Sequence, residues 1–314
     1  MATDGGSTAI VAALTANIGI AVTKFIAFLL TSSSSMLAES IHSLADSGNQ
    51  VLLLVGGKRA KRAATPDHPF GFGRERYVYA FIVAIVLFSI GGLFALYEGY
   101  HKWLEPEPIN AWKWVPIAVL VAAIGMESYS FRTAIVESNR VRGDRPWVEF
   151  VRTAKAPELP VVLLEDAAAL VGLVLALFGV TLTLLTDDGR WDAVGTGLIG
   201  VLLVSVAVVL AIEMKSLLIG EGASPQAVRR IAAALVGDGV VSVIHLKTLH
   251  LGPEELLVAA KIEVDAGESA AEVGRAIDAA EQRVRAAEPI ARQIYLEPDL
   301  RRIAPQTGVQ PSAR

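Results

Sequence analysis

Long apolar runs separated by short polar segments dominate the first two thirds of the chain. Each of six runs is about 20 residues or more in length, which is what a helix needs to cross the hydrocarbon core of a bilayer. They occupy about residues 9–30, 36–57, 77–103, 113–132, 160–185 and 193–214. Polar breaks such as the serines at 32–35 and the Glu-Pro-Glu-Pro segment at 105–108 separate them. This pattern predicts an all-α transmembrane domain of six helices over residues 1–221.

Beyond the last apolar run the charges become dense and the apolar segments short. Residues 224–236 have the period of an amphipathic helix, with Ser224 placed to cap it and Pro225 at its first position. Two segments rich in Val, Ile and Leu, a second helical pattern and a last apolar segment follow at 239–250, 256–265, 268–287 and 290–296. The order αββαβ predicts a small α+β domain of ferredoxin-like type over residues 222–300. The polar segment 301–314 predicts a disordered tail.

Positive charges are concentrated in two of the segments that separate the apolar runs. The segments after the second and fourth runs hold Lys58, Arg59, Lys61, Arg62, Arg74, Arg76, Arg132, Arg140, Arg142, Arg145, Arg152 and Lys155. Because Lys and Arg accumulate on the cytoplasmic side of membrane proteins, both segments and both termini are expected in the cytoplasm. The short loops and the lack of a basic region before the first run favour a multi-pass protein of a bacterial inner (plasma) membrane without a cleaved signal peptide.

Composition supports a membrane protein and limits its chemistry. Of the 314 residues, 53% are apolar and 19% are charged, whereas about 25% are charged in soluble chains. The mean hydropathy is +0.49. The net charge of −4 gives no reason to expect nucleic acid as a partner. The chain has no cysteine, so a bound metal would be held by histidine and carboxylate, which suits Zn²⁺, Mn²⁺ or Fe²⁺ better than Cu⁺.

Two clusters of ionisable residues interrupt the apolar runs. In the second run, His42 and Asp46 are four residues apart, so they share one helix face and can bind a metal ion through an imidazole nitrogen and a carboxylate oxygen. Glu39 lies one turn before His42. The fifth run holds the adjacent carboxylates Glu165 and Asp166, which cannot both stay charged and unpaired at hydrocarbon depth. A divalent cation shared between the two clusters would satisfy them, with only one of the adjacent pair expected to face it.

Each of these residues also has a structural interpretation. A lone buried histidine is usually hydrogen-bonded within a core, and a single carboxylate could pair with Lys24 of the first run. Glu39 could be solvated near the outer interface, and Glu98 and Glu127 are expected to have packing or interfacial roles. The occurrence of candidate ligands on two different runs favours the metal site.

Three stretches of the chain resemble motifs of the cation diffusion facilitator family of zinc transporters. They are SMLAESIHSLADSGNQ at 35–50, DHPFGFG at 67–73 and GGLFALYEG at 91–99. The resemblance extends over about residues 8–300, and VVLLED at 161–166 is similar to the branch that contains the mitochondrial zinc transporter and its bacterial relatives. It implies a homodimer that exports a divalent metal ion, Zn²⁺ as first choice, in exchange for protons. It also implies that there is no prosthetic group and no enzymatic activity.

The resemblance implies a transport site of two residues from the second run and two from the fifth, each pair four residues apart. His42 and Asp46 match the first pair, and Asp166 matches one member of the second. The usual histidine falls on Val162. The candidates for the missing fourth ligand are water, Glu165, Glu39 and Asn49. A site richer in oxygen would favour Mn²⁺ or Fe²⁺, and binding to neutral imidazole and ionised carboxylates would release protons.

Other metal positions of the family are incompletely matched. The loop pair falls on His68 and Phe72, and the positions in the cytoplasmic domain fall on His245, Lys261, Tyr295 and Glu297. No metal is expected at either place.

Other functions remain open at this stage. The chain could export Mn²⁺, Fe²⁺ or Co²⁺ with the same fold, or act as a membrane sensor or scaffold that does not transport. An intramembrane metalloenzyme is disfavoured because no HExxH motif is present.

Overall fold

The computed structural model describes residues 2–31, 34–106 and 113–300, with side chains at 7–26, 29, 40 and from 43 onwards within those ranges. The predicted tail 301–314 and the side chains of Glu39 and His42 lie outside this description. The chain divides into two compact units, Met1–Ile219 and Gly220–Arg314.

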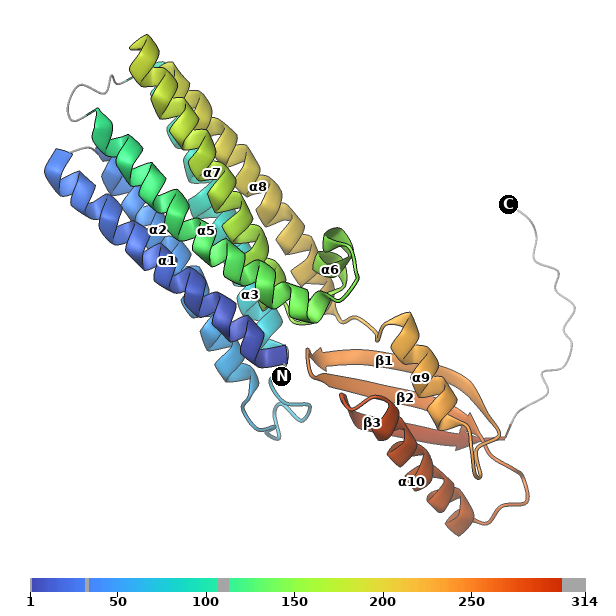
Figure 1. Cartoon of the computed structure of the whole chain (residues 1–314). Coiled ribbons are helices and arrows are strands. Elements are labelled where there is room, and N and C mark those ends of the chain that lie inside the picture. The colour runs from blue at the N-terminus through green and yellow to red at the C-terminus, as the bar shows by residue number, and fades with distance from the viewer. Residues whose placement is uncertain (1, 32–33, 107–112, 301–314) are drawn as a thin grey trace, which may run out of the picture. The chain divides into compact units, whose positions relative to one another are not determined.

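The first unit is built of long helices that run side by side (Figure 1). Their bounds are α1 Ala2–Thr31, α2 Ser34–Ala60, α3 Glu75–Val86, η1 Leu87–Leu93, α4 Phe94–Leu104, α5 Trp114–Arg142, α6 Trp147–Thr153, α7 Glu158–Thr186 and α8 Arg190–Ile219. Helix α2 contacts α1 and α3, α1 contacts α5 and α7, and α7 contacts α5 and α8. Helix α8 in turn contacts α3, η1 and α4, so the helices close into a ring.

Five stretches among the described residues are long and apolar enough to cross a membrane. They are Ser7–Ile26, Glu75–Leu104, Trp114–Arg142, Glu158–Thr186 and Arg190–Ile219. The second predicted span forms α2, a helix of 27 residues, but it is not among these five. Its polar residues from Ser40 to Gln50 lower its hydropathy, and several of them are buried inside the unit. The crossing of the membrane by α2 therefore stays a prediction.

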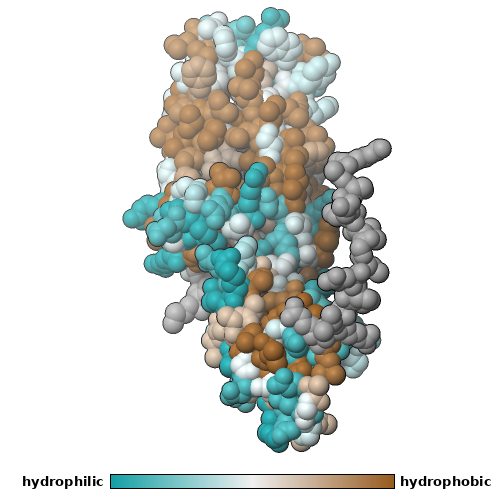
Figure 2. All heavy atoms as spheres, turned by 90° about the vertical axis from the view of Figure 1, so that its right-hand side faces the viewer, coloured by the Kyte–Doolittle hydropathy of each residue, from teal (hydrophilic) through white to brown (hydrophobic). Residues whose placement is uncertain are grey.

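The outer surface of the helical unit is apolar. Figure 2 shows it as a broad brown region on the face in view. Exposed large apolar side chains on α7 and α8 include Val171, Val174, Phe178, Leu198, Val201 and Ile212. An apolar surface of this extent is unfavourable in water and favourable against lipid.

The third predicted span is not a uniform α-helix. Its middle, η1, is a π-helix of seven residues. It contains Gly91 and Gly92, and the hydroxyl of Ser89 donates to the carbonyl oxygen of Ile85 at 2.8 Å. Glycine and such side-chain bonds weaken regular α-geometry, and π-helical turns are frequent at functional sites.

Close packing of α4 on α8 depends on a glycine. A Cβ atom added at Gly200 would lie 2.8 Å from the backbone nitrogen of Leu96, whereas one added at Gly197 would meet nothing within 4 Å. We expect Gly200→Ala to lower the free energy of unfolding by about 1–3 kcal/mol through overpacking, measured by thermal unfolding in detergent. Gly197→Ala, the control on the same helix, should be neutral or slightly stabilising. Equal stabilities of the two variants would contradict this role of Gly200.

The second unit has the element order predicted from the sequence. It contains α9 Pro225–Leu235, β1 Ser242–Gly252, β2 Glu255–Glu263, α10 Ala270–Ala287 and β3 Ala291–Asp299. The sheet has the order β1-β2-β3, with β1 antiparallel and β3 parallel to β2. Alternate residues of β2, including Leu256, Val258 and Ile262, point into the core against Ile231 of α9 and Val284 of α10. That this unit has a ferredoxin-like fold stays a prediction.

Side chains cap both helices of this unit at their first turns. Ser224 accepts a hydrogen bond from the Ala227 amide, as predicted. Ser269 and Glu272 form a reciprocal capping box at the start of α10. We expect Ser269→Ala to cost about 1 kcal/mol of helix stability. Amide hydrogen exchange of residues 270–287 in the full chain should then be about fivefold faster, while exchange in α9 should be unchanged. Unchanged exchange in α10 would contradict a stabilising cap.

Candidate cation-binding site

A cavity of about 110 Å³ lies inside the helical unit. Its walls come from α1, α2, η1, α4, α5, α7 and α8. The charged residues that line it are Lys24, Asp46, Glu98, Lys102, Glu127, Glu165 and Asp166. Three of the predicted site residues, Asp46, Glu165 and Asp166, therefore share one cavity.

The carboxylate of Glu165 joins α7 to α2. It is 5% exposed, and its two oxygens accept hydrogen bonds from Asn49 Nδ2 at 2.7 Å and Gln50 Nε2 at 2.9 Å. The amide oxygens of Asn49 and Gln50 are buried without a hydrogen-bond partner among the described residues. Glu165 is thus held by two neutral donors, which stabilise its charged form inside the protein.

Asp166 is oriented from another direction, by helix α5. It is 1% exposed, and the hydroxyl of Ser130 donates to its Oδ2 at 2.6 Å. The adjacent residues Glu165 and Asp166 therefore have different partners, although both reach the cavity wall. Both side chains line the cavity, and the prediction that only one of the pair faces the metal site stays a prediction.

Asp46 lines the cavity from α2, one turn before Gln50. The backbone of His42 lies one turn before Asp46 in the same helix. Within the described part of the chain, no group of three His, Cys, Asp or Glu side chains is close enough to hold a metal ion. The carboxylates surround the cavity without forming a closed coordination shell.

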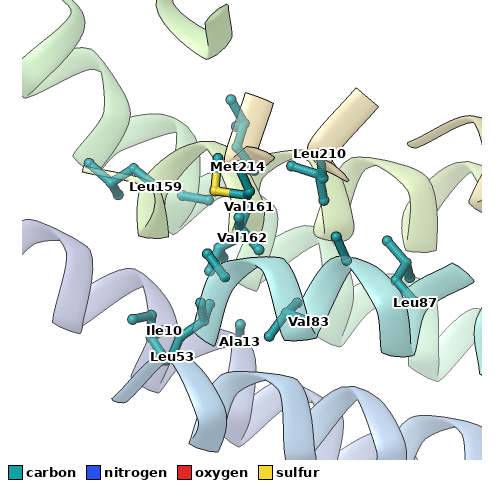
Figure 3. Close-up of a cluster of buried hydrophobic side chains, with 14 of the residues drawn as sticks. Ile10, Ala13, Leu53, Val83, Leu87, Leu159, Val161, Val162, Leu210 and Met214 are labelled. Atoms are coloured by element: carbon teal, nitrogen blue, oxygen red, sulfur yellow. The ribbon is translucent and has the colours of Figure 1, made fainter. Parts of the chain in front are cut away.

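Val162 lies away from the cavity, although it precedes Asp166 by one helical turn. It is fully buried in an apolar cluster with Leu53, Val83, Leu159 and Met214 (Figure 3). In the other direction along α7, the cavity continues past Asp166 to Ala176. Glu165 and Asp166 thus lie at the end of the α7 wall that is nearer Val162. A histidine at position 162 would replace a valine that is packed in this apolar cluster.

Four charged residues of the cavity wall had no transport role predicted from the sequence: Lys24, Glu98, Lys102 and Glu127. Two of them, Glu127 of α5 and Lys24 of α1, are buried. The Lys24 ammonium donates to the Ser43 hydroxyl at 3.2 Å. The signal that marks them is a single charge within an apolar run, which by default indicates a functional position in a membrane protein.

The other metal positions of the family hold different chemistry. His68 stacks against the ring of Phe72 at 4.6 Å. In the second unit, Lys261 lies beside His245 of β1 and forms ion pairs with Glu297 at 3.1 Å and Asp299 at 2.7 Å. Hydrogen bonds to these two carboxylates raise the pKa of Lys261. A fixed ammonium group therefore neutralises the carboxylates of β3.

Comparison with known proteins matches residues 10–219 to the model of the cation efflux transmembrane domain. A proton-coupled zinc antiporter of Xenopus laevis, SLC30A9, is 34% identical over 246 residues, covering 77% of this chain and 44% of the relative. Metal tolerance protein C4 of Arabidopsis thaliana is 28% identical, covering 81% and 56%. An uncharacterized transporter of Methanocaldococcus jannaschii is 23% identical, covering 93% and 97%.

The chain spans less than half the length of the vertebrate relatives that it matches. The family match nevertheless covers the whole ring of helices and the cavity within it. The chain therefore belongs to the cation efflux family, the cation diffusion facilitators.

Proposed function

We propose that this protein exports a divalent metal cation in exchange for protons, with Zn²⁺ as the first choice. The observation that supports this most directly is the convergence of Asp46, Glu165 and Asp166 on one cavity, in a unit where five of the described helical stretches are long and apolar enough to cross a membrane. Carboxylates are costly inside a bilayer unless a cation or proton neutralises them.

We assign coordination to His42 and Asp46 of α2 and to Asp166 of α7, with Glu165 as the remaining contributor. The Ser130 hydroxyl bound to Oδ2 of Asp166 would orient this carboxylate toward the ion. Hydrogen bonds from Asn49 and Gln50 tie Glu165 to α2, so Glu165 would also link movement of α7 to movement of α2. Partners outside the coordination shell commonly orient metal ligands in this way.

Exchange for protons follows from the chemistry of these groups. A metal ion binds neutral imidazole and ionised carboxylates, so binding releases protons and protonation releases the metal. If the site is exposed in turn to the cytoplasm and to the opposite side, inward movement of protons drives outward movement of the metal. The names of the vertebrate relatives as proton-coupled zinc antiporters support the same exchange.

Export of Mn²⁺, Fe²⁺ or Co²⁺ is the second candidate. Val162 replaces the family's histidine and is packed in the apolar cluster, so oxygen ligands outnumber nitrogen ligands around the cavity. Oxygen-rich sites favour Mn²⁺ and Fe²⁺ relative to Zn²⁺.

We also propose a plasma-membrane location with both termini in the cytoplasm. The basic segments after α2 and α5 would then face the cytoplasm, as the distribution of Lys and Arg favours. By the family resemblance the protein would act as a homodimer, with the second unit contributing to the contact between protomers.

Metal flux into proteoliposomes tests the function directly. The full chain, reconstituted with an imposed pH gradient, is assayed with Zn²⁺, Mn²⁺, Fe²⁺ and Co²⁺ in parallel, with protein-free vesicles and vesicles without a gradient as controls. We expect gradient-dependent uptake, greatest for Zn²⁺. Faster uptake of Mn²⁺ or Fe²⁺ would support the second candidate. No flux of any ion would contradict transport and support a sensor or scaffold.

A further inference from the structure

The inner face of helix α5 is polar where it meets the cavity. Ala123, Glu127, Ser130 and Ala134 are all buried and follow one another at intervals of three or four residues, so they lie on one side of the helix. Two alanines thus flank a carboxylate and a hydroxyl. Ser130 is already engaged with Asp166, which leaves the role of Glu127 to be explained.

Glu127 is buried like a core residue, but its side chain ends in a carboxylate, a group that binds metal ions. It is 2% exposed and lines the cavity. Among the described residues, none donates a hydrogen bond to its carboxylate and none forms an ion pair with it. An ionised carboxylate at this depth in the helical unit is costly unless a proton or a cation neutralises it.

The charged surroundings of Glu127 are those of the proposed metal site. The charged groups that act on it electrostatically are Asp166, Asp46, Glu165 and Lys24. Among the described residues, Lys24 and Glu127 form no ion pair, and the Lys24 ammonium donates to the Ser43 hydroxyl of α2. Glu127 therefore adds a further carboxylate to a cavity that already holds an excess of them, and a bound cation resolves this excess.

From these contacts we infer that Glu127 is an oxygen ligand of the transported divalent cation. The cation site then draws on three helices, α2, α5 and α7, with Glu127 as the ligand from α5 and Ser130 as a residue that positions Asp166. This inference rests on the proposed transport function. A third carboxylate, in addition to those of Asp46 and Asp166, makes the ligand set richer in hard oxygen donors. Glu127 therefore also shifts the preference of the site from Zn²⁺ toward Mn²⁺.

Equilibrium binding of Zn²⁺ and Mn²⁺ to the purified full chain tests this assignment, together with flux in proteoliposomes. Glu127→Gln keeps the shape of the side chain and removes its charge. We expect it to weaken binding of both ions by about 10–100-fold and to weaken Mn²⁺ binding more than Zn²⁺ binding. The matched control is Glu137→Gln, on the same helix and also buried, whose carboxylate is paired with Arg140 at 2.7 Å and does not line the cavity. This control should bind both ions like the unmodified protein.

A second variant covers the case in which Glu127→Gln does not fold. Glu127→Asp keeps the carboxylate but shortens the side chain by one methylene. If the carboxylate coordinates the ion, this variant should bind both ions more weakly. If Glu127 acts only through its negative charge in the cavity, binding should be unchanged. Wild-type affinity and selectivity in a folded Glu127→Gln variant would overturn the assignment of Glu127 and leave the transport function intact. Absence of binding and flux in the unmodified protein would instead overturn the transport function and this inference together.

Discussion

Asp46→Ala is expected to abolish metal flux while the protein stays folded. Asp46 lines the cavity from α2 opposite Glu165 and Asp166 of α7, so its removal takes a proposed ligand from one side of the site. Flux should fall by at least about 100-fold, because even partners outside the coordination shell cost about 10–100-fold in metal affinity or activity. Folding should persist, since alanine also removes the desolvation cost of the carboxylate. Initial rates of gradient-driven Zn²⁺ uptake in proteoliposomes measure the effect.

Asp144→Ala is the control for this experiment, because Asp144 is an exposed aspartate that does not line the cavity. Its flux should equal that of the unmodified protein. Size-exclusion profiles and thermal unfolding of both variants establish that they are folded. Near-normal flux in a folded Asp46→Ala variant would remove Asp46 from the proposed site.

Glu158→Ala is expected to destabilise the helical unit by about 3–5 kcal/mol. Arg76, in the first turn of α3, donates from its Nε to Glu158, the first residue of α7. The two side chains are 12% and 5% exposed, so solvent replaces little of the lost interaction. Removing Glu158 alone leaves the partly buried guanidinium of Arg76 without its carboxylate, which costs far more than the pair contributes when it is intact. Unfolding of the purified protein in detergent measures the loss.

A double-mutant cycle tests whether the loss of stability comes from the broken ion pair or from the smaller volume of the new side chain. In the double variant Arg76→Met and Glu158→Leu, both charges are replaced by apolar side chains of similar size, and stability should return close to that of the unmodified protein. Arg76→Met alone and Glu158→Leu alone, the two single variants of the cycle, should both be destabilised like Glu158→Ala. A double variant that is as unstable as the single variants would show that the ion pair is not the source of the effect.

Local patterns in the sequence predicted the long helices of the first unit and the elements of the second, but neither the short helix α6 nor the π-helix η1. Apolar runs long enough to cross a bilayer became helices, because hydrophobic length and helical hydrogen bonding depend on neighbouring residues. The second run, predicted at 36–57, forms α2 at Ser34–Ala60. In the second unit, Ser224 and Pro225 begin α9 as predicted, and the segments around Gly252 and Pro253 form the antiparallel pair β1 and β2.

The contacts of individual polar residues could not be read from these patterns. Glu127 was expected to have a packing or interfacial role, but it lies on the cavity wall. Only one of Glu165 and Asp166 was expected to face the metal site. Their separate partners, the amides of α2 and Ser130 of α5, come from helices distant in the sequence. The direction of each of these side chains depends on how α5 and α7 are rotated against their neighbours.

By itself, the sequence determined the number and order of the apolar and amphipathic segments and the residue types available as ligands, because these depend on composition and on periodicity within each segment. Only the tertiary structure decided which charges meet. Helix packing brings Asp46, Glu127, Glu165 and Asp166 from three helices to one cavity, and it turns Val162 into an apolar cluster one turn away. The physical reason is that a helix can rotate about its axis at little local cost, so side-chain packing between helices selects which face points inward.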